Sequence, residues 1–123
     1  MSASFIQAEP DQLAFLPARA ALVVIDMQRD FLEPDGFGSS LGNDVGHLRS
    51  AIAACAQALA VARQNGLLVI HTREGHRPDL ADAPPAKLAR GAPGKKIGDE
   101  GPMGRILVRG EPGHDIVADL APW

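Results

Sequence analysis

The apolar residues of this chain fall into two short runs and one helical stripe. Residues 20–25 are consecutive apolar residues ending in three β-branched ones, and a continuous run of this kind is typical of a strand buried on both faces of a parallel sheet. Residues 67–70 form a second apolar run. Between the runs, apolar residues recur at steps of three and four and predict an amphipathic helix: Val45, Leu48, Ile52, Cys55, Leu59 and Ala62.

The predicted helix has its own start and stop signals. Asn43 or Asp44 precedes its first apolar residue and suits the N-cap position. Asn65-Gly66 follows its last apolar residue, where glycine suits a left-handed C-cap. Strand, helix and strand together predict a right-handed parallel crossover. The expected fold class is therefore α/β with a mostly parallel sheet.

The remaining segments lack a clear period. Residues 1–19 predict an extended arm, because prolines interrupt any helix that would lead into the first strand. Phe31–Gly42 is rich in turn formers and predicts a loop over the carboxyl end of that strand. Residues 72–104 predict a long functional loop that covers substrate or forms an interface. After it, residues 105–108 predict a short third strand and residues 114–120 a short helical turn.

Composition and charge narrow the classes of function. A chain of 123 residues forms one domain at most, and its net charge of -3 gives no reason to expect nucleic acid or an anionic membrane as partner. No apolar run approaches the roughly 20 residues that cross a bilayer, and the N-terminus lacks a secretory pattern. The single cysteine cannot form an internal disulfide, which fits a reducing compartment. We therefore expect a cytoplasmic protein with a small-molecule partner.

Asp26 directly follows the first apolar run. In open α/β folds, ligands and catalytic groups collect at the carboxyl ends of the strands, which is where this residue is expected. A carboxylate in a half-dry position is costly unless it has a partner or a chemical role. The pattern alone leaves two interpretations open: an acid that pins a loop or caps a helix, or a general base.

Three stretches carry a resemblance to a known family. The string VVIDMQRDF, residues 23–31, resembles the first-strand signature of the isochorismatase-like cysteine hydrolases. This family includes nicotinamidases, N-carbamoylsarcosine amidohydrolase, ureidoacrylate amidohydrolase and biuret hydrolase. HTREGHRPDLAD (His71 to Asp82) and GRILVRGEPGHDI (Gly104 to Ile116) resemble its biuret and triuret hydrolase branch in particular. Together, the matches extend from about Ala20 to Leu120.

The resemblance implies a three-layer α/β sandwich with a mostly parallel sheet. Residues 20–123 would be the N-terminal part of a single hydrolase domain, preceded by the arm of residues 1–19. The family has an Asp, Lys, Cys triad, and Asp26 matches its first member. Its lysine and nucleophilic cysteine belong to a later strand and helix of the family and find no counterpart here. The one cysteine, Cys55, falls on the apolar face of the predicted helix, where a structural role is expected. We therefore expect the chain to be part of a longer protein, and the 123-residue segment alone to be inactive.

The implied activity is cysteine-dependent hydrolysis of a linear C–N amide bond in a small ureido compound, biuret or triuret first, with release of ammonia. In the implied mechanism, Asp26 takes the proton of the thiol and later returns it to the leaving nitrogen. The alternatives are a ureidoacrylate or N-carbamoyl amide hydrolase, a nicotinamidase-like enzyme or, in another class, a non-catalytic binding or assembly module. The family resemblance also implies a homo-oligomer, either a dimer or a tetramer.

Three further residues are candidates for substrate binding. Phe31 matches the family position that packs against the substrate, with a plain core phenylalanine as the alternative. Arg73 and Glu74 directly follow the second apolar run, where they would meet the polar ends of a urea-like substrate. The alternative for this pair is a solvated loop.

A metal site is also considered. His71, Glu74 and His76 have the chemistry of zinc ligands. Nicotinamidases of the family bind a metal through an Asp followed by two histidines in this loop, and here Leu80 stands roughly where the second histidine would be expected. The ligand set is incomplete, so we predict neither a metal nor another cofactor.

Overall fold

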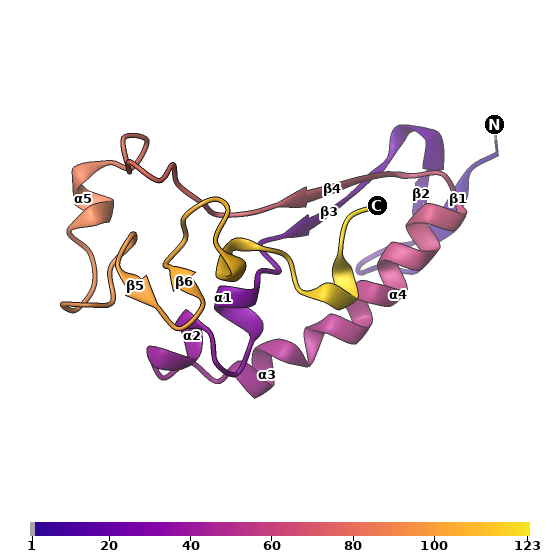
Figure 1. Cartoon of the computed structure of the whole chain (residues 1–123). Coiled ribbons are helices and arrows are strands. Elements are labelled where there is room, and N and C mark those ends of the chain that lie inside the picture. Colours follow the sequence, from indigo (N-terminus) through magenta and orange to yellow (C-terminus); the bar gives the residue numbers. More distant parts are fainter. Residues whose placement is uncertain (1) are drawn as a thin grey trace.

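The computed structural model describes residues 2–123 and has a parallel strand pair at its centre. β3 (Ala21–Ile25) and β4 (Leu68–Thr72) pair in parallel, with a register from Ala21↔Leu68 to Ile25↔Thr72. The connection between them contains four helices (Figure 1): α1 (Arg29–Leu32), α2 (Phe37–Ser40), α3 (Val45–Arg49) and α4 (Ala51–Gln64). The predicted α/β class with a parallel sheet is confirmed.

The predicted amphipathic helix is present as two helices, α3 and α4, which meet at Ser50. Asp44 is the N-cap of α3, since its carboxylate accepts a hydrogen bond of 2.9 Å from the main-chain N–H of His47. Most residues of the predicted stripe are buried, whereas Leu48 is 41% exposed and Cys55 is half-buried against the core. The periodicity therefore identified the packed face correctly in most of its positions.

The core lies between one face of the strand pair and α4, which runs along the pair in Figure 1. The short helical turn η3 (Ala118–Leu120) closes the core from the C-terminal side. Burying one aliphatic side chain stabilises a fold by about 1.5–3 kcal/mol. The buried residues of this cluster are Val24, Leu32, Ile52, Leu59, Val117 and Leu120.

The opposite face of the strand pair is open. Its apolar side chains come from alternate positions of both strands, and they are exposed by 45% at Val23, 65% at Ile25, 62% at Leu68 and 40% at Ile70. The prediction that the first strand is buried on both faces is therefore wrong for residues 2–123. Its continuous apolar run has a partner layer on one side only.

The helical stretch Val45–Gln64 is long and apolar enough to cross a membrane by length and composition alone, with an 18-residue window of mean hydropathy 1.3. It is not a continuous apolar run, because His47, Arg49 and Ser50 interrupt it. Ile52, Leu59 and Ala62 of this stretch are buried in the core of residues 2–123, and 22% of the window is buried in all.

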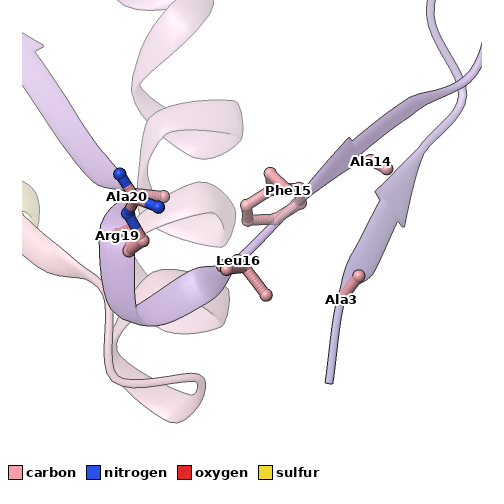
Figure 2. A pocket seen from close by; sticks show the side chains of 6 residues that line it. All are labelled: Ala3, Ala14, Phe15, Leu16, Arg19 and Ala20. Atoms are coloured by element: carbon pink, nitrogen blue, oxygen red, sulfur yellow. The ribbon is translucent and has the colours of Figure 1, made fainter. Parts of the chain in front are cut away.

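The N-terminal segment forms a hairpin at the amino end of the strand pair. β1 (Ser4–Ile6) and β2 (Leu13–Phe15) pair antiparallel, and the turn η1 (Pro17–Arg19) leads into β3. The extended backbone predicted here thus folds back on itself. An open hollow of about 470 Å³ lies beside the hairpin. Figure 2 shows the side chains that line it, those of Ala3, Ala14, Phe15, Leu16, Arg19 and Ala20.

At the other end of the pair, the long loop contains little regular structure. It forms α5 (Pro85–Leu88), β5 (Glu100–Gly101) and β6 (Gly104–Arg105), and the turn η2 (Pro112–His114) follows. The third strand predicted at residues 105–108 is reduced to the two-residue β6, which pairs with β5 and not with the central pair. Ile106 and Leu107 are buried in a turn, where Leu107 has a left-handed backbone, and Val108 forms only an isolated bridge with His76.

Candidate active site

Asp26 lies where β3 ends, half-buried, beside the last residue of β4. Its main-chain N–H donates to the carbonyl oxygen of Thr72 (3.2 Å) and to the Thr72 hydroxyl oxygen (3.1 Å). In turn, the Thr72 hydroxyl donates to Oδ1 of Asp26 at 2.7 Å. Asp26 adopts a left-handed backbone with φ 52°, a conformation that costs an L-residue about 1–2 kcal/mol. Strain of this kind clusters at functional sites.

Gln28 holds together the two loops that border the carboxyl end of the strand pair. Its side chain is fully buried, and its amide nitrogen donates to the carbonyl oxygens of Glu74 (2.9 Å) and His114 (3.1 Å). Its side-chain oxygen accepts the Glu74 N–H at 2.7 Å. The loop after β4 and the segment around η2 are therefore fixed to the residues that follow Asp26.

Asp30, two residues further along in α1, also connects distant segments. It is 2% exposed, and its carboxylate accepts a hydrogen bond of 3.3 Å from the N–H of Leu107. Burial raises the pKa of Asp30, and backbone hydrogen bonds from Leu107 and Phe37 oppose this shift in part. Gly113 packs directly on this carboxylate, in space that the Cβ of any other residue would need. These contacts bring η2 close to α1.

Two histidines lie in the same region. His76 and His114 are 7% and 5% exposed, and Nδ1 of His76 is 3.4 Å from the carboxylate of Asp82. His114 packs on Gly75, and burial lowers its pKa. Nε2 of His76 and Nδ1 of His114 have no hydrogen-bond partner within residues 2–123. Buried ring nitrogens without partners are unusual, and both ring nitrogens of His71 share this property.

The candidate metal ligands are not brought together. His71 pairs with Val24 in the strand register and so faces α4, and its pKa is lowered by burial and by the nearby Arg63. Glu74 forms an ion pair with Lys87, with 2.7 Å between the carboxylate and Nζ. Within residues 2–123, no group of three or more metal-ligating side chains is assembled.

A pocket of about 260 Å³ opens next to Phe31 and Glu74. Its apolar walls carry a cationic rim, since Lys87, Arg90 and Lys95 also line it. The ammonium of Lys95 donates to the carbonyl oxygen of Ser40 at 2.6 Å, which ties the long loop to α2. The full lining is Phe31, Phe37, Leu41, Glu74, Lys87, Arg90, Gly91, Lys95, Ile97 and Leu107.

The structure brings together two of the four predicted site residues. Phe31 and Glu74 share the pocket, whereas Asp26 is not among its lining residues. Arg73 instead forms a surface ion pair with Asp115, with 3.2 Å between the guanidinium and the carboxylate. The roles predicted for these four residues remain predictions.

The sequence interpretation missed the residues that organise the site. Gln28 and Asp30 follow the first strand in the sequence, but no pattern shows that their partners lie 46 and 77 residues away. Thr72 had one usable signal: it ends the second predicted strand beside the strand that leads to Asp26, as a parallel crossover requires.

Comparisons with known proteins agree on one family. The isochorismatase domain matches residues 20–123. The ureidoacrylate amidohydrolase RutB of Serratia proteamaculans (strain 568) is 30% identical over 125 residues, which cover 95% of this chain and 49% of that protein. The crystal structure of an isochorismatase family protein from Desulfovibrio vulgaris is similar with a TM-score of 0.62 and 33% identity, covering 86% of this chain and 48% of that chain. The chain thus spans about half the length of these relatives.

Proposed function

The chain belongs to the isochorismatase family, and from this membership we propose that the whole protein is an amidohydrolase. The proposed reaction cleaves a linear C–N amide bond in a small ureido compound and releases ammonia. Biuret and triuret are the first proposed substrates, because the stretches His71 to Asp82 and Gly104 to Ile116 resemble that branch. The observation that carries the proposal is the half-buried, strained Asp26 at the carboxyl end of a parallel strand pair.

Asp26 is the proposed proton carrier. One oxygen of its carboxylate accepts the Thr72 hydroxyl, and Oδ2 accepts no hydrogen bond within residues 2–123. The free oxygen suits a base that takes the proton of a thiol, the nucleophile that the family resemblance implies. After the thiolate attacks the carbonyl carbon, the same carboxyl group protonates the leaving nitrogen, so that ammonia departs. Water then hydrolyses the acyl intermediate and restores the thiol.

Phe31 and Glu74 are the proposed substrate contacts. A planar ureide stacks favourably on an aromatic face, and Phe31 presents its ring to the pocket. In the proposal, the Glu74 carboxylate accepts hydrogen bonds from the N–H groups of the ureide. Its oxygens then bind the ureide in addition to the ammonium of Lys87, with which Glu74 forms an ion pair. Arg73, held by Asp115 on the surface, keeps its proposed role only if that ion pair opens when substrate binds.

The cationic rim of the pocket favours a second candidate, a hydrolase of carboxylate-bearing ureides. Lys87, Arg90 and Lys95 face a single acid, Glu74, so the lining carries an excess of positive charge. Biuret and triuret are neutral and gain little from such a field, whereas ureidoacrylate carries a carboxylate. This candidate fits the relative that is named a ureidoacrylate amidohydrolase.

A substrate panel tests both candidates. The whole protein is assayed for ammonia release from biuret, triuret, ureidoacrylate, an N-carbamoyl amino acid and nicotinamide. The first proposal expects the highest kcat/KM on biuret or triuret, and the second expects it on ureidoacrylate. Arg90→Gln separates them further, because it should raise KM for ureidoacrylate and leave KM for biuret unchanged. Absence of turnover on every ureide would reject the amidohydrolase proposal and favour a non-catalytic binding module.

A further inference from the structure

The end of β4 presents one hydroxyl group to Asp26, that of Thr72. This hydroxyl takes part in two hydrogen bonds, one as acceptor from the Asp26 N–H (3.1 Å) and one as donor to Asp26 Oδ1 (2.7 Å). A hydroxyl can serve both roles at once. The main chain and the side chain of Asp26 are thus joined in a small ring through one Thr72 oxygen.

The ring matters because Asp26 is strained. A non-glycine residue with φ 52° persists only where its surroundings over-determine the conformation. Here the main-chain N–H of Asp26 has two acceptors on Thr72, the carbonyl oxygen (3.2 Å) and the hydroxyl oxygen. Because threonine is β-branched, its χ1 angle is stiff, and the position of the hydroxyl is set by the backbone of β4. The carboxylate therefore takes its direction from a neighbouring strand.

We propose that Thr72 is a positioning residue for Asp26. Its hydroxyl occupies Oδ1 and holds the carboxylate so that Oδ2 is the oxygen that exchanges the proton during the reaction. This inference rests on the proposed role of Asp26. Thr72 acts through Asp26 and has no contact with the reacting atoms in the proposal.

Two substitutions isolate the hydroxyl. Thr72→Val keeps the branched shape and removes the hydroxyl, while Thr72→Ser keeps the hydroxyl and removes a methyl group. In the whole protein, Thr72→Val should lower kcat by about 10- to 100-fold and leave KM unchanged within a factor of about two, since misplacing a catalytic group costs up to that much. Thr72→Ser should recover most of kcat. Wild-type kcat in Thr72→Val, or an equal loss in both variants, would overturn the proposal.

A measurement without turnover separates this inference from the proposed function. The urea midpoint of unfolding is compared for Thr72→Val in two backgrounds, Asp26 and Asp26→Ala. If the hydroxyl holds the carboxylate, the midpoint should fall more in the first background than in the second, where Thr72→Val removes only the hydrogen bond from the main-chain N–H of residue 26 to the hydroxyl. Equal changes of the midpoint in both backgrounds would overturn the proposal that Thr72 positions the Asp26 carboxylate, even if the enzyme is active. If the wild type turned over no ureide, the proposed function would fail, and this comparison alone would decide whether Thr72 positions Asp26.

Discussion

The two ends of the β3–β4 pair differ in what they bury. At the carboxyl end, the protein encloses polar side chains that are at most 7% exposed: Gln28, Asp30, His76 and His114. At the amino end, the β1–β2 hairpin leaves apolar side chains in contact with solvent, with exposures of 62% at Phe5, 49% at Ile6 and 54% at Leu13. Figure 1 shows the hairpin at one end of the pair and the loops around α1 and β6 at the other.

This difference indicates where the chemistry lies. Burying a polar group costs free energy unless it finds a hydrogen-bond partner. A buried polar network whose members are paired fixes the positions of the segments that it joins. Gln28 is an example, because three hydrogen bonds of its side chain fix two loops beside Asp26. The amino end has no comparable network in the residues described. We therefore expect substitutions at the two ends to differ in effect even when the residue type is the same.

The largest contrast is expected between two aspartates. Asp26→Asn at the carboxyl end should lower kcat on the preferred ureide by about 10²- to 10⁴-fold, because an amide cannot take up the proton. Asp11→Asn, in the exposed turn of the hairpin, should leave kcat within a factor of about two. Steady-state ammonia release measures both. A similar kcat for the two variants would remove Asp26 from the mechanism.

Two glutamines provide the next contrast. Gln28→Ala should lower the free energy of unfolding by about 3 kcal/mol, because it leaves the Glu74 N–H and two carbonyl oxygens without their buried partner. Gln7→Ala, at an exposed position in the hairpin, should change it by less than about 0.5 kcal/mol. Urea unfolding followed by circular dichroism gives both values. Equal stabilities would mean that the Gln28 network contributes nothing to the fold.

Two phenylalanines test substrate contact. Phe31→Leu should raise KM about 2- to 10-fold, since it removes an aromatic face worth about 0.5–1.5 kcal/mol from the pocket. Phe5→Leu, whose side chain is 62% exposed in the hairpin, should leave KM unchanged. The readout is the ratio of KM values, with kcat as the internal check. An unchanged KM in Phe31→Leu would assign this ring to the core instead.

The smallest expected effect concerns how stability depends on pH. The sign of this dependence should differ between a buried acid, Asp30, and an exposed acid, Asp82, both at the carboxyl end. Because burial raises the pKa of Asp30, its stabilisation is complete below the ordinary value of 3.8 and is lost as pH rises through the raised native pKa. Asp30→Asn should therefore gain stability relative to the wild type as pH rises above 3.8. Asp82 behaves oppositely: hydrogen bonding from the Arg77 N–H lowers its pKa, so its stabilisation is lost as pH falls.

Unfolding curves at several pH values measure the two trends. Asp82→Asn should lose stability relative to the wild type as pH rises, the reverse of Asp30→Asn. The same slope for both variants would contradict the difference in burial between the two carboxylates.

Local features of the fold were predictable from the sequence. The strand pair, the crossover and the Asp44 cap depend on short-range patterns that solvent and backbone geometry impose, and each is present. The second face of the pair was not predictable in this way. The continuous apolar run of residues 20–25 indicates that both faces tend to be buried, but it carries no information on what covers them, and Val23 and Ile25 are exposed in the described chain.

The candidate site was predictable only in part. Asp26, Phe31 and Glu74 could be singled out because they follow apolar runs or match a family motif, and Phe31 and Glu74 do meet in one pocket. The pairings that give the site its shape connect distant residues. Thr72 reaches Asp26 across 46 residues, and Asp115 draws Arg73 to the surface across 42. No periodic pattern in the sequence indicates contacts at such separations, so these two pairings could be found only in the structure.

The most direct test of the central claim, that substrate binds at the carboxyl end of the strand pair, is amide chemical-shift mapping by NMR. The Asp26→Asn variant of the whole protein is titrated with biuret and, separately, with ureidoacrylate, so that binding is observed without turnover. The account predicts that the amides of residues 26–31 and of Glu74 shift with at least one ligand, while those of the β1–β2 hairpin stay in place. Shifts confined to the hairpin, or no shift with either ligand, would contradict it.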